Sequence, residues 1–262
     1  MAMSAAVARM PDGWMPVPDS LRDRVVLITG ATGGLGRATA LAAAKAGAGV
    51  VLLGRKVRSL EKVYDEITAL AGAKPAIYPL DLAGATPRDY ADLADTLERE
   101  CGRLDGIVHA AAHFDGLQPA ADIAPQEWMR ALHVNLSAPF LLTQTCLPLL
   151  QQSADASVVF VLDDPARMGR AFWGGYGVAK HALGGLTRIL HEETENGPVR
   201  VHALLPTPMR TALRRAAYYG ENTLALPLPD AAAVVYLLSA DAAPARGCTL
   251  DLRAPHLRKA TD

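Results

Sequence analysis

The chain has 262 residues, of which half are hydrophobic and one fifth are charged, and its formal net charge is −1. This composition fits one large α/β domain or two small ones, and the near-zero charge gives no electrostatic reason to expect a nucleic-acid or anionic-membrane partner. The three cysteines, Cys101, Cys146 and Cys248, are far apart and in no metal-ligand spacing. We therefore expect reduced thiols, no metal site and a cytoplasmic protein.

The first twenty residues, "MAMSAAVARMPDGWMPVPDS", lack the apolar run of a signal peptide. Their prolines and Gly13 predict a loosely ordered leader over residues 1–20. The longest apolar stretch, "SAPFLLTQTCLPLL", is too short and too polar to span a bilayer, so no membrane partner is expected.

Short apolar runs then alternate with helical patterns along the chain. The expected strands are "RVVLIT", "GVVLLG", "AIYPLDL", "DGIVHAA", "SVVFVL", "VRVHALL" and "CTLDL". Helical patterns separate them, including a long one over residues 125–152, one over 174–195 and one near 230–239. Apolar strands separated by helices indicate a parallel sheet that is covered on both faces.

This pattern predicts a single doubly wound Rossmann-type α/β domain over residues 21–254, followed by a C-terminal tail over residues 255–262. We expect a parallel sheet of about seven strands with helices on both faces. A sheet of this kind binds its ligand in the crevice at the carboxyl ends of the strands.

A glycine-rich stretch, "TGATGGLGRA", connects the first expected strand to the first expected helix. Gly30, Gly34 and Gly36 remove side chains where the backbone must approach a phosphate, and the helix offers its N-terminal N–H groups and its dipole. The placement of the glycines predicts a dinucleotide site. A tight strand–helix turn without a ligand is the alternative.

The second expected strand ends in Gly54 and Arg55, with Lys56 and Arg58 close behind. NAD-selective sites usually place a carboxylate here to hold the ribose 2′-hydroxyl, whereas a guanidinium grips a 2′-phosphate with two hydrogen bonds. Arg55 therefore favours NADP(H) over NAD(H). For Lys56 and Arg58, a solvated helix start is the preferred interpretation.

The stretch "VVFVLDDPARMGRAFWGGYGVAK" begins as an apolar strand and ends in two carboxylates, Asp163 and Asp164. Tyr176 follows Asp163 by thirteen residues, and Lys180 follows Tyr176 by four. A tyrosine and a lysine four residues apart on a helix share one face, so both can reach the same cleft. Taken alone, the pair also fits an ordinary amphipathic helix.

With "TGATGGLG", "YGVAK", Asp81 in "PLDLA" and Asn135 in "HVNLSAPF", the chain resembles the short-chain dehydrogenase/reductase family over about residues 21–252. The resemblance implies that Tyr176 transfers the proton at the heteroatom of the reacting carbon. It also implies that Lys180 holds the nicotinamide ribose and lowers the pKa of the tyrosine, and that Asn135 holds a water in a proton relay. The expected cofactor contacts are Gly30, Thr32, Gly34, Leu35, Gly36, Arg55, Asp81, Leu82, Ala110, Lys180, Pro206 and Thr211. A homodimer or homotetramer, built through the long fourth and fifth helices, is a further implication.

The chain departs from the family pattern near the cofactor. "AAA" at 110–112 replaces the usual Asn-Ala-Gly, and "LPT" at 205–207 replaces Asn-Pro-Gly. The family also carries a mobile substrate lid where residues 208–228 fall.

A further departure is Asp163, which replaces the usual catalytic serine. A carboxylate accepts hydrogen bonds but cannot donate them, so it suits a substrate that presents N–H groups, and it raises the pKa of a nearby tyrosine. Pteridine reductases are similar at this position, and Phe114 falls where their aromatic residue sandwiches the pterin. His113 and Trp173 are further candidates for substrate contacts.

These observations predict an NADPH-dependent reductase of a small carbonyl or C=N substrate, in which Tyr176, Lys180, Asn135 and Asp163 are the catalytic residues. One alternative is a pteridine-reductase-like activity on dihydropterins or dihydrofolate. Another is a catalytically weak or non-catalytic NADP(H)-binding protein.

Overall fold

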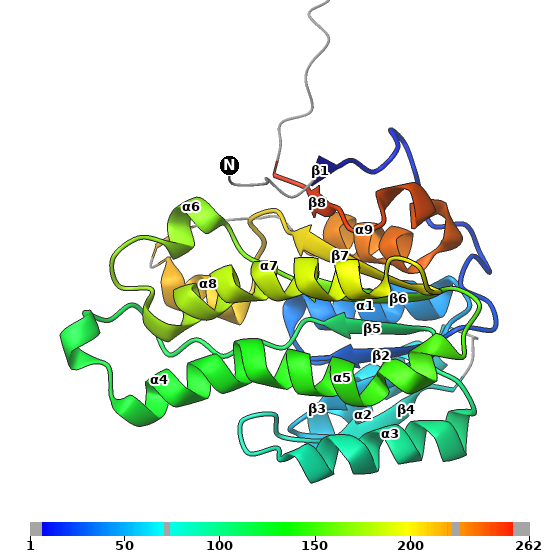
Figure 1. The fold of residues 1–262 in the computed structure, drawn as a ribbon, viewed down its shortest axis with the longest axis horizontal. Coiled ribbons are helices and arrows are strands. Elements are labelled where there is room, and N and C mark those ends of the chain that lie inside the picture. The colour runs from blue at the N-terminus through cyan, green and yellow to red at the C-terminus, as the bar shows by residue number, and fades with distance from the viewer. Residues whose placement is uncertain (1–6, 71–73, 219, 222–225, 254–262) are drawn as a thin grey trace, which may run out of the picture.

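The computed structural model describes residues 7–70, 74–218, 220–221 and 226–253. Within them, eight parallel strands form one sheet in the order β1-β8-β7-β6-β5-β2-β3-β4, with helices on both faces (Figure 1). The strands are β1 (Val7–Ala8), β2 (Val25–Thr29), β3 (Gly49–Gly54), β4 (Ala76–Pro79), β5 (Gly106–His109), β6 (Ala156–Val161), β7 (Val199–Leu205) and β8 (Thr249–Asp251). The predicted single doubly wound domain is confirmed, with eight strands instead of about seven.

The helices divide between the two faces of the sheet. The α-helices are α1 (Gly34–Lys45), α2 (Val57–Thr68), α3 (Pro87–Cys101), α4 (Pro125–Leu132), α5 (Ala138–Gln151), α6 (Pro165–Met168), α7 (Gly174–Thr194), α8 (Ala212–Ala217) and α9 (Leu228–Leu238). Buried side chains of α1, α2 and α9 form one core, and those of α3, α5 and α7 form the other. Figure 1 shows α5 and α7 in front of the sheet.

The strands are apolar throughout because each one supplies both cores. In β2, Val26 and Ile28 belong to the core under α1 and α9, whereas Leu27 belongs to the core under α3, α5 and α7. Successive side chains of a strand point to opposite faces, so a sheet covered on both sides needs an apolar residue at every position.

The eighth strand comes from the segment that was expected to be a loosely ordered leader. Val7 pairs with Thr249 and Ala8 with Leu250, which places β1 at the edge beside β8. Trp14 then packs edge-to-face on Tyr236 with ring centroids 5.2 Å apart. A two-residue strand is too short to leave a periodic pattern in the sequence. Residues 1–6 of the leader and the expected tail over 255–262 lie outside the described residues.

The long helical pattern over 125–152 forms two α-helices joined by a π-helical turn, η2 (His133–Ser137), which lies between α4 and α5. The turn contains Asn135, one of the predicted catalytic residues. π-turns within α-helices are rare and occur often at functional sites.

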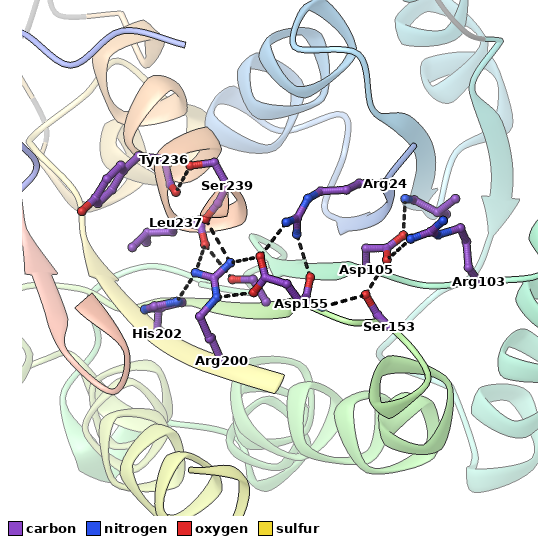
Figure 2. A network of polar contacts seen from close by, with 12 residues as sticks. Arg24, Arg103, Asp105, Ser153, Asp155, Arg200, His202, Tyr236, Leu237 and Ser239 are labelled. Atoms are coloured by element: carbon purple, nitrogen blue, oxygen red, sulfur yellow. Dashed lines mark hydrogen bonds and ion pairs between the residues drawn. The ribbon is translucent and has the colours of Figure 1, made fainter. Parts of the chain in front are cut away.

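A network of ion pairs lies at the amino ends of the strands, opposite the edge where a ligand is expected (Figure 2). Asp155 precedes β6 and pairs with Arg24 at 2.5 Å and with Arg200 at 2.6 Å. Arg200, only 3% exposed, also donates to the carbonyl oxygens of Leu237 and Ser239, at the end of α9. Burial acts to raise the pKa of Asp155, but the hydrogen bonds and charges of both arginines outweigh it and lower that pKa. The network therefore joins β2, β6, β7 and α9.

Asp155→Ala should lower the free energy of unfolding by about 3 kcal/mol, because it leaves the buried Arg200 without its counter-charge. Urea unfolding at neutral pH measures the change. The lowered pKa of Asp155 means that its contribution is complete above the unfolded-state pKa and is lost as the pH falls through the folded-state value. The difference between wild type and variant should therefore shrink in acid. Asp92→Ala, which removes an exposed ion pair with Arg88 on α3, is the control and should cost less than about 0.5 kcal/mol. Equal effects of the two substitutions would contradict the role of the network.

Candidate active site

A cleft of about 730 Å³ lies at the carboxyl ends of the strands. It is lined by residues that directly follow β2, β3 and β5 (Gly30, Arg55 and Ala110) and by residues just beyond β6 and β7 (Asp163 and Pro206). The chain runs outward from β2 to β3 and β4 and then returns to place β5 on the other side of β2. The cleft thus lies at the point where the strand order reverses, which is where doubly wound sheets bind nucleotides.

The glycine-rich loop packs so tightly that side chains are excluded at two positions. Gly30 has φ +64°, and a Cβ there would lie 2.7 Å from the Cα of Ala111. A Cβ on Gly36 would lie 2.2 Å from the carbonyl oxygen of Gly30. The loop can therefore bring its backbone, and the first N–H groups of α1, close to a phosphate. The first turn of α1 contains no acidic residue that would repel the negative charge of a phosphate.

The cleft brings together all of the predicted cofactor contacts. The lining includes Gly30, Thr32, Gly34, Leu35, Gly36, Arg55, Asp81, Leu82, Ala110, Lys180, Pro206 and Thr211. Arg55 also borders a second cavity of about 440 Å³, which Arg37, Lys56 and Lys62 line as well, whereas Arg58 does not. The end of β3 is therefore strongly basic. Arg37 pairs there with Glu66 at 2.5 Å.

Tyr176 and Lys180 lie on one face of α7, and both are buried at the cleft. The Tyr176 hydroxyl donates to Oδ2 of Asp163 at 2.8 Å, and the Lys180 ammonium donates to the carbonyl oxygen of Val161 at 2.7 Å. Burial lowers the pKa of Lys180 to about 8, against the opposing charge of Asp163. Burial, followed by the charge and the hydrogen bond of Asp163, raises the pKa of Tyr176 well above its usual value. This direction is opposite to the lowering that the family resemblance implied for the tyrosine, and it agrees with the effect expected of Asp163.

Asn135 is buried in the π-turn and uses its side chain to hold the loop after β5. Its Oδ1 accepts from the backbone N–H of His113 at 3.0 Å, and its Nδ2 donates to the carbonyl oxygens of His113 and Ala131, both at 2.8 Å. Asn135 does not line the cleft, whereas His113 does, and Nε2 of His113 lies 3.2 Å from a carboxylate oxygen of Glu127. The role of Asn135 in holding a water stays a prediction.

The aromatic residues near the cleft form a cluster around Tyr176. Phe114 lies 5.3 Å from Trp173 and 5.2 Å from Tyr176 between ring centroids, and Trp173 lies 5.9 Å from Tyr218. Phe114 and Trp173 do not line the cleft, so their contact with the site is made through Tyr176. Phe114 and Trp173 therefore pack against the Tyr176 ring on its side away from the cleft.

Comparison with known proteins identifies the family. The family model described as short chain dehydrogenase matches residues 24–222. The chain belongs to the short-chain dehydrogenase family. It is 37% identical to the uncharacterized oxidoreductase YciK of Escherichia coli K12 over 224 residues, which cover 86% of this chain and 88% of that protein. The predicted family and the predicted class, an oxidoreductase, are confirmed.

Solved structures of related dehydrogenases have the same fold. One from Pseudomonas syringae is 39% identical, with a TM-score of 0.88 over 93% of this chain and 99% of that chain. One from Escherichia coli CFT073, complexed with NADPH, is 36% identical, with a TM-score of 0.86 over 90% of this chain and 99% of that chain. A third, from Shigella flexneri, is complexed with NADP.

Three arginines of this dehydrogenase line the cleft without having been expected there, namely Arg167, Arg214 and Arg253. Arg167 and Arg214 lie over the ring of Tyr218, at 5.1 and 4.4 Å from its centroid. Arg253 directly follows the expected strand "CTLDL" and lies two residues beyond Asp251, where β8 ends. That position was the one usable signal in the sequence, because residues that follow a parallel strand face the ligand crevice.

Part of the expected substrate lid is described. Residues 212–217 form α8, which Thr211 caps by accepting a hydrogen bond from the backbone N–H of Arg214. Residues 219 and 222–225 of this segment lie outside the described residues.

Neither a metal site nor a membrane span is found in the described part of this dehydrogenase. Among the described residues, the His, Cys, Asp and Glu side chains form no group of three or more that could hold a metal ion. None of its described helices has the length and apolar character needed to cross a membrane.

Proposed function

We propose that this dehydrogenase is an NADPH-dependent reductase of a small substrate with a C=O or C=N bond. The main support for this proposal is that the glycine-rich loop, Arg55 and the buried side chains of Tyr176 and Lys180 all line one cleft. The relatives complexed with NADP and NADPH support this choice of cofactor.

The side chains present fit that cofactor. The backbone of the glycine-rich loop suits the pyrophosphate, and the basic end of β3 suits a 2′-phosphate, because no carboxylate stands at the position of Arg55 to repel it. When bound, the cofactor supplies a hydride from C4 of its nicotinamide. Lys180, buried on the same helix face as Tyr176, is placed to hold the ribose hydroxyls.

Tyr176 is the proposed proton source of the reduction. Its raised pKa keeps the hydroxyl protonated at neutral pH, which suits the direction that delivers a proton to the substrate. Lys180 contributes a positive charge 5.7 Å from the centre of the tyrosine ring. Asn135 maintains the shape of the cleft by fixing the backbone of His113.

We propose that the expected homodimer or homotetramer forms through the helices on one face of the sheet. α4, α5 and α7 carry large apolar side chains that are exposed in the single chain, namely Met129, Phe140, Val178 and Ile189. Such side chains support an interface between copies.

Arg55→Ala should weaken NADPH binding about tenfold or more and leave NADH binding unchanged, since it removes a charge-assisted contact with the 2′-phosphate alone. Fluorescence titration of both cofactors measures the two affinities. Arg58→Ala is the matched control, because Arg58 is exposed nearby but does not line either cavity. Equal affinity of wild type for both cofactors would contradict the proposal.

Tyr176→Phe should lower kcat at least ~10²-fold, because it removes the proton donor, while NADPH affinity and the unfolding temperature change little. Loss of NADPH absorbance is followed with a panel of ketones, quinones and pterins. Tyr64→Phe, on α2 away from the cleft, is the control. If wild type binds NADPH but turns over no member of the panel, the non-catalytic NADP(H)-binding alternative is favoured.

Asp163 sets the proposed class of substrate. Its carboxylate lines the cleft and accepts a hydrogen bond from the Tyr176 hydroxyl. Beside a developing alkoxide, a carboxylate opposes the build-up of negative charge, whereas a substrate that presents N–H groups and is protonated on nitrogen can donate a hydrogen bond to it. A C=N substrate, such as a dihydropterin, is therefore favoured over a simple ketone. The position of Phe114, behind Tyr176, gives no support to an aromatic sandwich of the pteridine-reductase type.

Asp163→Ser should abolish turnover of C=N substrates and introduce turnover of ketones, because a hydroxyl can donate to a developing oxyanion. Dihydrobiopterin, dihydrofolate and simple ketones are assayed with wild type and variant. Asp163→Asn keeps the shape without the charge and separates the two effects. Rapid ketone reduction by wild type, without any turnover of pterins, would exclude this class of substrate.

A further inference from the structure

We propose that Arg253 is a positioning residue of the active site, which holds the Asp163 carboxylate against Tyr176 through contacts with Asp164. The inference rests on the proposed function, because it concerns Asp163 and Tyr176, the side chains to which that function assigns the chemistry. Arg253 lies just beyond β8, far in sequence from both, and its side chain lines the cleft.

The guanidinium of Arg253 is fixed to the end of the sheet. Its Nε and Nη2 donate to the two carboxylate oxygens of Asp251 at 2.9 and 2.8 Å, and its backbone N–H donates to the same side chain at 2.9 Å. Asp251 is the last residue of β8. A guanidinium held by two parallel hydrogen bonds has a defined orientation. Its third nitrogen, Nη1, lies 2.6 Å from Oδ1 of Asp164.

Asp164 connects Arg253 to the predicted catalytic residues Asp163 and Tyr176. Its backbone N–H donates to Oδ1 of Asp163 at 2.7 Å, and Oδ2 of Asp163 accepts from the Tyr176 hydroxyl at 2.8 Å. An unbroken series of polar contacts therefore runs from β8, through the loop after β6, to α7.

The segment that carries Asp163 and Asp164 leaves the sheet before it reaches the packed turn of α6. The last sheet-like hydrogen bond of this segment joins the N–H of Leu162 to the carbonyl oxygen of Leu204, and α6 is only one turn long. Asp164 also accepts from the N–H of Ala166, and it has a longer contact of 3.5 Å with Arg167, whose side chain is 41% exposed.

Charge gives a second reason for the anchor. Asp163 and Asp164 are adjacent carboxylates that repel each other, and the Arg253 cation offsets the charge of Asp164. The other charged groups nearby include Asp251 on β8, Lys180 on α7, Arg167 on α6 and Arg214 on α8. Because Arg167 is more exposed, its contact is the more easily screened by solvent.

Arg253→Met keeps the aliphatic stem and removes the anchor. We expect kcat to fall about tenfold, the effect of losing one well-oriented charged contact, with the KM for NADPH changed by less than about twofold. Arg253→Lys should restore part of the loss. Arg103→Met is the matched control, because Arg103 also grips a carboxylate with two nitrogens, but at the amino ends of the strands (Figure 2). It should leave kcat unchanged.

The pH profile separates positioning from a general loss of charge. Burial, the charge of Asp163 and its hydrogen bond together raise the pKa of Tyr176, with a smaller contribution from Tyr218. If Asp163 moves away, the pKa of Tyr176 falls, and the alkaline limb of the reduction shifts to lower pH. Loss of the Arg253 cation with Asp163 still in place would shift that limb to higher pH, and this result would overturn the proposal.

A combined variant and a crystal structure complete the test. In an Asp163→Ser background, assayed with the ketones that this variant is expected to reduce, Arg253→Met should cause no further loss of kcat, whereas a loss as large as that in the wild-type background would show that Arg253 acts elsewhere. Crystal structures of wild type and Arg253→Met report the distance between Asp163 and Tyr176 without any turnover. Persistence of the 2.8 Å contact in the variant would overturn the inference. Failure of wild type to reduce any substrate would instead refute the proposed function and leave the structural comparison decisive.

Discussion

The hydrogen bond from the Tyr176 hydroxyl to the Asp163 carboxylate joins α7 to the end of β6 in the middle of the cleft. In the structure this hydrogen bond engages the proton that Tyr176 is proposed to pass to a substrate, and it keeps a negative charge beside the tyrosine hydroxyl. Burial and this charge raise the pKa of Tyr176, so the hydroxyl stays protonated. A carboxylate at this place can accept a hydrogen bond from an N–H group, and this property connects the unusual aspartate with the proposed preference for C=N bonds.

The two ends of the sheet carry different functions. At the carboxyl ends, the glycine-rich loop after β2 leaves room for a ligand. Burial at this end also lowers the pKa of Lys180. At the amino ends, Asp155 is enclosed by Arg24 and Arg200, and its charge is stabilised. Parallel strands allow this separation because all their carboxyl ends lie on the same edge. Packing at one edge can thus stabilise the fold without restricting the chemistry at the other.

The edge of the sheet formed by β1 and β8 lies close in the fold to the loop that carries Asp164. β1 pairs with β8, and β8 leads into Arg253, whose guanidinium reaches Asp164. β1 and β8 therefore belong to the same half of the sheet as β6, the strand that leads into the Asp163 loop. The proposed positioning role follows from this arrangement.

The sequence by itself determined the features that depend on local spacing. The glycines of the first loop, the helical spacing of Tyr176 and Lys180, and the strands that are apolar on both faces all predicted the doubly wound fold and its cleft, because each depends on residues close in the chain. Only the tertiary structure decided which partner each polar side chain takes. Asp163 could have paired with an arginine of its own loop but bonds to Tyr176, and Asn135 holds the backbone of His113. The pairing of β1 and the reach of Arg253 were likewise decided by long-range packing. Such contacts depend on rotamers and on the approach of distant segments, which leave no periodic signal in the sequence.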